Sequence, residues 1–179
     1  MIKLLAFILS TLTCSHGIAA DYDRSRFGVW SDLDGDCQNT RAEILIAQSQ
    51  STVTFSNPSF CKVVTGKWYS LFTGQEHQLA SELHIDHIVP LAWAWTHGAS
   101  SWTSEDLIKF GNDMNNLIPV EPSLNMEKGA LGPDKWLPPT NKCEYFFRFE
   151  VLRKAYMLEL TNWEQESFKV IQDVCSAEN

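Results

Sequence analysis

The pattern of apolar and polar positions divides the chain into a mixed first part and a helical last part. Near the start, Thr40 and Glu43 have the S/T-x-x-E spacing of a capping box, which predicts a helix over residues 40–50. The next segments, residues 52–55 and 61–69, are β-branched and alternate with polar residues. They predict short strands and a hairpin.

The middle of the chain carries two strand patterns, over residues 83–89 and 117–120, and each runs into a proline. Between them, residues 103–111 begin with a capping sequence and predict a helix. After the second strand, Ser123 is expected to cap a short helix over residues 124–128. The predicted order is therefore strand, strand and then helix.

The last part of the chain predicts two helices. Asn141 is expected to cap a helix over residues 142–160, and Thr161 with Glu164 forms a second capping box that opens a helix to about Cys175. Because the connection is short, these helices should form an antiparallel hairpin. The whole pattern predicts an α+β fold.

The N-terminus has the layout of an exported chain. Lys3 supplies a positive charge, residues 4–12 are apolar, and residues 17–20 are small, as in a secretory signal peptide. A buried helix and a membrane anchor are the alternatives, and Cys14 allows a lipoprotein anchor, although the match is poor. Residues 1–20 are therefore assigned to a signal and residues 21–179 to one domain, expected in the periplasm or the medium.

Composition limits the classes of function. The 179 residues are 44% hydrophobic and 20% charged, enough for one buried core, and the net charge is −8. Removal of residues 1–20 takes away one lysine and no acid, which leaves −9. This charge argues against broad electrostatic adsorption to nucleic acid or to an anionic membrane. No membrane contact is expected once the signal is removed.

Four cysteines remain after removal of the signal, and an even number in an exported chain favours two disulfides. A four-thiolate zinc site is the alternative, but no close C-x2-C pair is present. If the C-terminal helices are antiparallel about residue 160, Cys143 and Cys175 reach the same end of the hairpin. That geometry favours a bridge between them and leaves Cys37 with Cys61.

A group of polar residues in the middle segment could carry chemistry. Asp86 and His87 stand near the end of the first of these two strands, Asn116 immediately precedes the second, and Asn125 follows nine residues later. Adjacent residues of a regular strand point to opposite faces, so Asp86 and His87 can share a site only near a strand end. Oxygen ligands beside an imidazole suit metal-assisted hydrolysis of phosphodiesters.

The stretch from residue 86 to 129 resembles the HNH, or ββα-metal, nucleases, and the longer run of residues 37–175 resembles the small secreted members of that group. Their pattern is Asp-His, then Asn-Leu, then a metal ligand nine residues after that Asn, near Lys-Gly. This chain has Asp86-His87, Asn116-Leu117, and Asn125 followed by Lys128-Gly129. The ligand position is often His; Asn stands there in the HNH module of RNA-guided CRISPR effectors.

The resemblance implies a role for each matched position. His87 would be the general base, and Asp86 and Asn125 would hold a divalent cation. Asn116 would orient the loop and His87. An asparagine ligand favours Mg²⁺ or Mn²⁺ over zinc or nickel. The implied fold is a ββα-metal (His-Me finger) core with an N-terminal helix and hairpin and a C-terminal helical hairpin, and the implied products have 5′-phosphate and 3′-hydroxyl ends.

Three further side chains are candidates for contact with a phosphate. Lys128 could bind one, or could stabilise the end of its helix. His84 shares a strand face with Asp86 and could line the cleft, or could be packed. Arg41 could reach the scissile phosphate, or could be an exposed helical arginine. His77 and His97 stand in polar stretches and are expected at the surface.

An acidic segment near the N-terminus copies part of a calcium loop. Its acids occupy positions 1, 3, 5 and 12 of such a loop, but Cys37 stands at position 6, where a glycine is favoured. An acidic surface turn is the alternative. The candidate ligands are Asp32, Asp34, Asp36 and Glu43.

The function predicted from these observations is metal-dependent endonucleolytic cleavage outside the cytoplasm. DNA is the expected substrate, RNA is the alternative, and little sequence preference is expected because no recognition domain is visible. Two other classes stay open, namely a non-catalytic exported nucleic-acid-binding module and a metal phosphoesterase that acts on small substrates.

Overall fold

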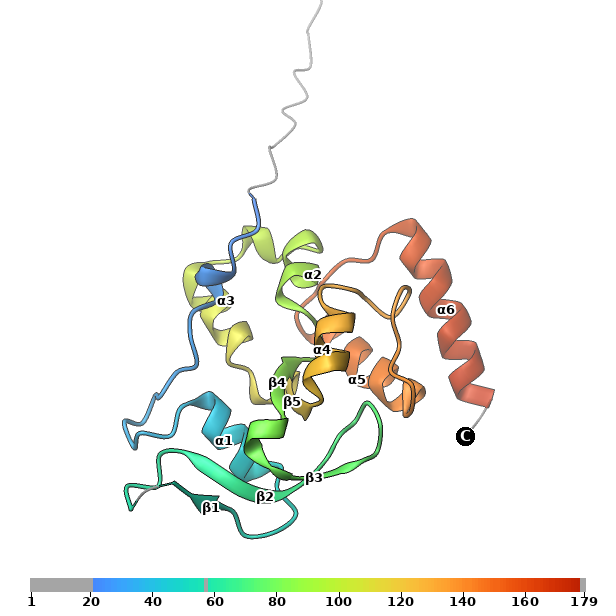
Figure 1. Ribbon diagram of the computed structural model, residues 1–179. Coiled ribbons are helices and arrows are strands. Elements are labelled where there is room, and N and C mark those ends of the chain that lie inside the picture. The colour runs from blue at the N-terminus through green and yellow to red at the C-terminus, as the bar shows by residue number, and fades with distance from the viewer. Residues whose placement is uncertain (1–20, 57, 178–179) are drawn as a thin grey trace, which may run out of the picture.

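The computed structural model describes residues 21–56 and 58–177. The predicted signal peptide, residues 1–20, lies outside the described residues. Helices and two small antiparallel sheets make up an α+β fold, as the sequence predicts. Figure 1 shows the larger sheet with α1 on one side of the molecule and the two C-terminal helices on the other.

The N-terminal part forms a short helix, a longer helix and a three-stranded sheet. The 3-10 helix η1 spans Arg24–Phe27, and α1 spans Thr40–Ala47, where the Asn39 side chain caps the backbone N–H of Ala42. The sheet has the order β1-β2-β3, with antiparallel neighbours. Its strands are β1 (Thr54–Phe55), β2 (Val63–Tyr69) and β3 (Glu76–Leu79).

A second, two-stranded sheet lies at the centre of the molecule (Figure 1). Its strands β4 (His84–His87) and β5 (Leu117–Val120) are antiparallel, and Asp86 pairs with Ile118. The helix α4 (Pro122–Lys128) follows β5 at once and contacts β4. The order strand, strand, helix is therefore present in space as well as in sequence.

The connection between β4 and β5 is helical. It contains α2 (Leu91–Thr96) and α3 (Ser104–Gly111), and the Thr103 side chain caps α3 as the sequence predicts. The helix α2 was not expected, because Pro90 directly after a strand pattern was interpreted only as a stop. Proline is well tolerated at a helix start, which explains its place here. The remaining 3-10 turns are η2 (Ala80–Glu82), η3 (Ala99–Ser101) and η4 (Met114–Asn116).

The chain ends in the predicted helical hairpin of α5 (Lys142–Ala155) and α6 (Asn162–Ala177), which contact each other. A disulfide joins Cys143 to Cys175 across its open end. A second disulfide joins Cys37 to Cys61, before α1 and before β2. Both predicted pairings are thus present in the structure.

The hydrophobic residues form two buried clusters, and the β4–β5 ribbon contributes to both. One cluster joins α2, α3, α5 and α6 and includes Ile118, while the other joins α1 and β2 and includes Ile85 and Leu117. Neighbouring residues of the ribbon face opposite clusters because strand side chains alternate. The ribbon is therefore packed on both sides.

Several sequence-based details were wrong. The α4 helix begins with Pro122 and its N-cap is Glu121, so Ser123 lies inside the helix. Asn141 makes no capping hydrogen bond, because its backbone is left-handed at φ 52° and its amide donates to the Leu71 carbonyl. The α5 helix ends at Ala155 rather than near residue 160.

His77 and His97 were expected at the surface, but their side chains are only 14% and 10% exposed. His97 stacks on Trp93 with ring centroids 3.6 Å apart, and its Nε2 lies 3.0 Å from Glu164 Oε1. His77 Nε2 lies 3.2 Å from Glu121 Oε1. Acids distant in the sequence therefore hold both rings.

Among residues 21–56 and 58–177, no helix is both long and apolar enough to cross a membrane.

Candidate active site

Three of the residues singled out in the sequence line one small pocket. Asp86, His87 and Asn125 all face a pocket of about 350 Å³, which β4 and α4 form together with residues of the N-terminal segment. Asp86 and His87 are 7% and 5% exposed. The pocket therefore combines a carboxylate, an imidazole and an amide from segments separated by more than 35 residues.

The end of β4 explains how adjacent residues reach one pocket. β4 ends at His87, and the chain bends at residues 88 and 89 before Pro90 opens α2. The strict alternation of side chains applies only within a regular strand. The expectation that Asp86 and His87 share a site near a strand end agrees with this geometry.

His87 is held by contacts on two sides. Its Nε2 lies 2.9 Å from the carbonyl oxygen of Gly111, the last residue of α3. Its ring stacks on Trp30, with centroids 5.6 Å apart and an angle of 17° between the planes. A side chain at position 111 would collide with the Phe27 carbonyl oxygen, so only glycine allows the end of α3 to pack this closely on residue 27.

These contacts define the protonation state of His87. Burial lowers the pKa of His87 to about 4, against the opposing effect of the hydrogen bond to Gly111. The imidazole is therefore neutral at neutral pH. A carbonyl oxygen can only accept a hydrogen bond, so Nε2 carries the proton and Nδ1 carries the lone pair.

Asn116 is fully buried and holds the segment that follows His87. Its Oδ1 accepts a hydrogen bond of 2.8 Å from the Val89 backbone N–H, and its Nδ2 donates one of 3.2 Å to the Val89 carbonyl. Its own carbonyl accepts from the Ile88 N–H at 2.8 Å. Three hydrogen bonds thus fix the bend after β4, as an orienting residue requires.

Asp86 forms a buried ion pair with Lys128. The Lys128 Nζ lies 3.0 Å from Asp86 Oδ2 and donates to Oδ1 at 3.2 Å. Burial raises the pKa of Asp86, and burial also lowers the pKa of Lys128, while each charge partly offsets the effect on the other. Asp86 Oδ2 is buried and accepts no well-aligned hydrogen bond within the described part of the chain.

Asn125 lines the pocket and contacts His84, which is not itself among the residues that line it. The Asn125 Nδ2 is 3.4 Å from Nδ1 of His84, the exposed first residue of β4. The amide nitrogen is a donor, so Nδ1 of His84 is the acceptor in this contact. Asn125 Oδ1 is not used in this bond.

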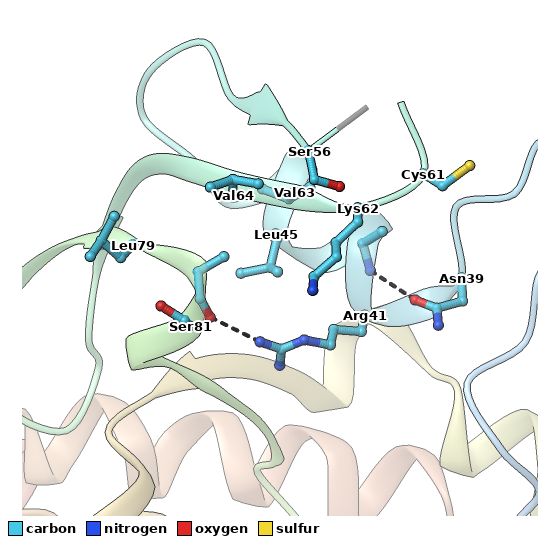
Figure 2. A pocket seen from close by; sticks show the side chains of 12 residues that line it. Asn39, Arg41, Leu45, Ser56, Cys61, Lys62, Val63, Val64, Leu79 and Ser81 are labelled. Carbon is cyan, nitrogen blue, oxygen red and sulfur yellow. Dashed lines mark hydrogen bonds between the residues drawn. The ribbon is translucent and has the colours of Figure 1, made fainter. Parts of the chain in front are cut away.

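The other two predicted phosphate contacts are placed differently. Lys128 is 0% exposed and its ammonium is engaged with Asp86, so in this conformation it does not offer that group to a phosphate. Arg41 lies at a separate pocket (Figure 2), where Nη2 donates to the carbonyls of Ala80 and Leu83 at 2.9 and 3.0 Å. It is half-buried rather than an exposed helical arginine.

The sequence reasoning missed three residues that surround His87. Arg24 lines the same pocket as Asp86, and its charge contributes to the lowered pKa of His87. Trp30 and Gly111 hold the ring, as described above. No local pattern marks these residues, because each comes from a separate segment that only the fold brings to the end of β4.

The acidic segment forms a compact turn. The Asp32 carboxylate accepts from the backbone N–H of Cys37, whose φ of 75° is left-handed. Burial and the three nearby aspartates raise the pKa of Glu43. Calcium binding here stays a prediction. Three exposed aspartates each place one carboxylate oxygen within 4.8 Å of the other two; they are Asp32, Asp34 and Asp36.

Comparison with known proteins places the chain in a family. Residues 39–173 match the family described as GmrSD restriction endonucleases, C-terminal domain. A protein of Arthroderma benhamiae (strain ATCC MYA-4681 / CBS 112371), described as an uncharacterized secreted protein, is 33% identical over 173 residues, which cover 94% of this chain and 83% of that protein. No solved structure matches the chain significantly.

Asp86, His87, Asn116 and Asn125 all fall within the matched segment, whereas Arg24 and Trp30 precede it. The match spans well over half of the chain. The chain therefore belongs to the HNH-type endonuclease family that is represented by the C-terminal domain of the GmrSD restriction endonucleases.

Proposed function

We propose that the protein is an exported, divalent-cation-dependent endonuclease that hydrolyses phosphodiester bonds of DNA with little sequence preference. One observation carries the proposal: the pocket at the end of β4 combines a buried carboxylate, a neutral imidazole and an amide in the order and spacing of the HNH pattern. In this proposal β4, β5 and α4 are the ββα-metal core.

The donor set fits a hard divalent cation. Asp86 Oδ2 is a buried carboxylate oxygen that Lys128 Nζ approaches to 3.0 Å without an aligned hydrogen bond, and Asn125 offers an amide oxygen at the same pocket. Oxygen donors favour Mg²⁺ or Mn²⁺ over zinc. Asp86 and Asn125 would hold the cation, which when bound supplies positive charge to the phosphoryl and leaving oxygens.

His87 is assigned as the general base. Its neutral ring carries the lone pair on Nδ1, because Nε2 is committed to the Gly111 carbonyl. Nδ1 takes a proton from the attacking water, the resulting hydroxide adds to phosphorus, and the bond from phosphorus to the 3′ oxygen breaks; the leaving 3′ oxygen takes a proton from solvent water to become the 3′-hydroxyl. The phosphate then stays on the 5′ end of one product. Asn116 positions His87 by fixing residues 88 and 89.

Arg24 is assigned as the positively charged side chain that binds the scissile phosphate, a role that the sequence suggested for Lys128 and Arg41. It lines the pocket with Asp86 and His87 and has no ion pair among the described residues. Arg24→Ala should lower the cleavage rate on the order of 10²-fold, as expected for loss of one preorganised donor. Arg148→Ala on the exposed face of α5 is the matched control and should change little.

Export is proposed from the predicted signal over residues 1–20 and from the description of the relative as secreted. The two disulfides support an oxidising compartment. Mass spectrometry of the protein secreted by an expressing host should give an N-terminus at Asp21. A protein that stays in the cell with residues 1–20 still attached would contradict export.

Incubation with supercoiled plasmid, in Mg²⁺ or Mn²⁺ and separately in EDTA, tests the proposed function. Nicking and linearisation that disappear in EDTA are the expected result. Plasmid binding without cleavage in either cation would instead support the non-catalytic binding module. Hydrolysis of small phosphoesters with an intact plasmid would support the phosphoesterase.

A further inference from the structure

A second hollow lies away from the proposed active site, between α1, β2 and the end of β3 (Figure 2). It has a volume of about 640 Å³. Its walls are mostly aliphatic, and two cations stand among them. None of its described lining residues is acidic. The residues that define its character are Leu45, Val63, Val64, Leu79, Arg41 and Lys62.

Arg41 enters this hollow as a half-buried charge that has no counter-charge among the described residues. Its Nη2 is bound to two neutral carbonyls, those of Ala80 and Leu83. No carboxylate lies within 4 Å of the guanidinium in residues 21–56 and 58–177. Guanidinium stays charged in proteins and has five donors, so Nε and Nη1 remain available to an anion.

Lys62 adds a second charge to the same hollow. Figure 2 shows its ammonium directed into the hollow, on the side of Arg41. It forms no ion pair or hydrogen bond within the described part of the chain and is exposed. Two unpaired cations that converge repel each other unless an anion lies between them. In a chain with a net charge of −8, this arrangement favours an anionic ligand.

The hollow is connected to the proposed active site through β4. Arg41 binds the carbonyl of Leu83, the residue before β4, and Asp86 is three residues further along. At about 3.3 Å per residue this separation along the strand is about 10 Å, which a substrate strand can span within a few nucleotides. His84, which contacts Asn125, lies between them.

We propose that this hollow binds a nucleotide of the substrate strand a few positions from the bond that is cut, with the phosphate between Arg41 and Lys62 and the base on the aliphatic floor. The proposal rests on the proposed nuclease function. Apolar side chains are suited to the faces of bases, and the polar side chains at the rim can bond to base edges. Those side chains belong to Asn39, Ser56 and Ser81.

The test measures binding without cleavage. A fluorescently labelled 12-nucleotide single-stranded DNA is titrated in EDTA with wild type, Lys62→Glu and the control Lys169→Glu, which makes the same charge change on an exposed residue of α6. Lys62→Glu should weaken binding on the order of tenfold more than the control does. Lys62→Ala should also reduce the salt dependence by about one phosphate contact.

Equal losses for Lys62→Glu and Lys169→Glu, or no loss for either, would overturn the proposal. Uptake of a fatty-acid probe by the hollow, with DNA affinity unchanged in Lys62→Glu, would overturn it too. Hydrolysis of bis(p-nitrophenyl) phosphate by the wild-type protein tests catalysis separately. If that hydrolysis is absent and the binding difference persists, the hollow is a nucleotide site and only the proposed hydrolysis fails.

Discussion

The Lys128 ammonium lies 3.0 Å from Asp86 Oδ2, in a pair that is almost wholly withdrawn from solvent. One partner is a proposed metal ligand near the end of β4, and the other is the last residue of α4. The pair therefore fixes α4 against β4, and the charge of Lys128 partly offsets the effect of burial, which raises the pKa of Asp86. Both roles can be tested separately.

Lys128→Met removes the counter-charge and leaves Asp86 buried alone. Breaking a buried pair in this way costs about 3–5 kcal/mol of unfolding free energy. Denaturant unfolding of Lys128→Met and of the exposed control Lys169→Met measures the effect, and the double variant Asp86→Asn/Lys128→Met should recover part of it. A loss no larger in Lys128→Met than in the control would show that the pair does not hold the fold.

His87 should make the stability of the protein pH-dependent. Burial lowers its pKa to about 4, so between the ordinary value of 6.5 and about 4 the unfolded chain binds the proton more tightly. The stability that this neutral group contributes is present above pH 6.5 and is lost as the pH falls to about 4, a difference of about 3 kcal/mol. His87→Gln cannot take up this proton.

Unfolding free energies at pH 7 and pH 4 for the wild type and His87→Gln measure the contribution of His87, because the other titrating groups are common to both proteins. The wild type should lose more stability than the variant. An identical loss in both proteins would mean that His87 is not buried in its neutral form.

Asn116→Ala should loosen the bend after β4. The substitution leaves the buried N–H and carbonyl of Val89 without their side-chain partner, and each such group costs about 1–3 kcal/mol. Because Asn116 is proposed to position His87, kcat should fall while the Mg²⁺ concentration for half-maximal rate stays unchanged. A shifted metal requirement with unchanged kcat would instead place Asn116 at the cation.

The disulfide between Cys143 and Cys175 closes a separation of 32 residues at the open end of the α5–α6 hairpin. By chain entropy it should add about 4 kcal/mol. The variant Cys143→Ser/Cys175→Ser should therefore unfold at a lower temperature and keep its cleavage rate at 25 °C, since neither cysteine lines the active-site pocket. Loss of cleavage below the melting temperature would contradict this separation.

Local patterns were sufficient for much of the fold. The capping box of Thr161 and Glu164 is present at the start of α6, because it depends only on residues three apart. Asn141 failed as a cap because a distant carbonyl, that of Leu71, engages its amide. Short-range signals thus succeed where no tertiary contact competes for the same side chain.

The candidate site also contains residues that local patterns predict and residues that only tertiary contacts bring together. Asp86, His87 and Asn125 could be found from spacing along two strands and a helix, and they share a pocket. The surroundings of His87 could not, because Arg24 and Trp30 come from the N-terminal segment and approach the ring only through tertiary packing. Their positions require coordinates, whereas the positions of the motif residues do not.

The rate of plasmid cleavage by His87→Ala at saturating Mn²⁺, compared with that of the wild type, tests the central assignment most directly. Loss of the general base should reduce the rate about 10²- to 10⁴-fold. The thermal stabilisation by Mn²⁺ should persist, because Asp86 and Asn125 are unchanged. A His87→Ala variant that is folded, responds to Mn²⁺ and cleaves at the wild-type rate would contradict the assignment of the active site.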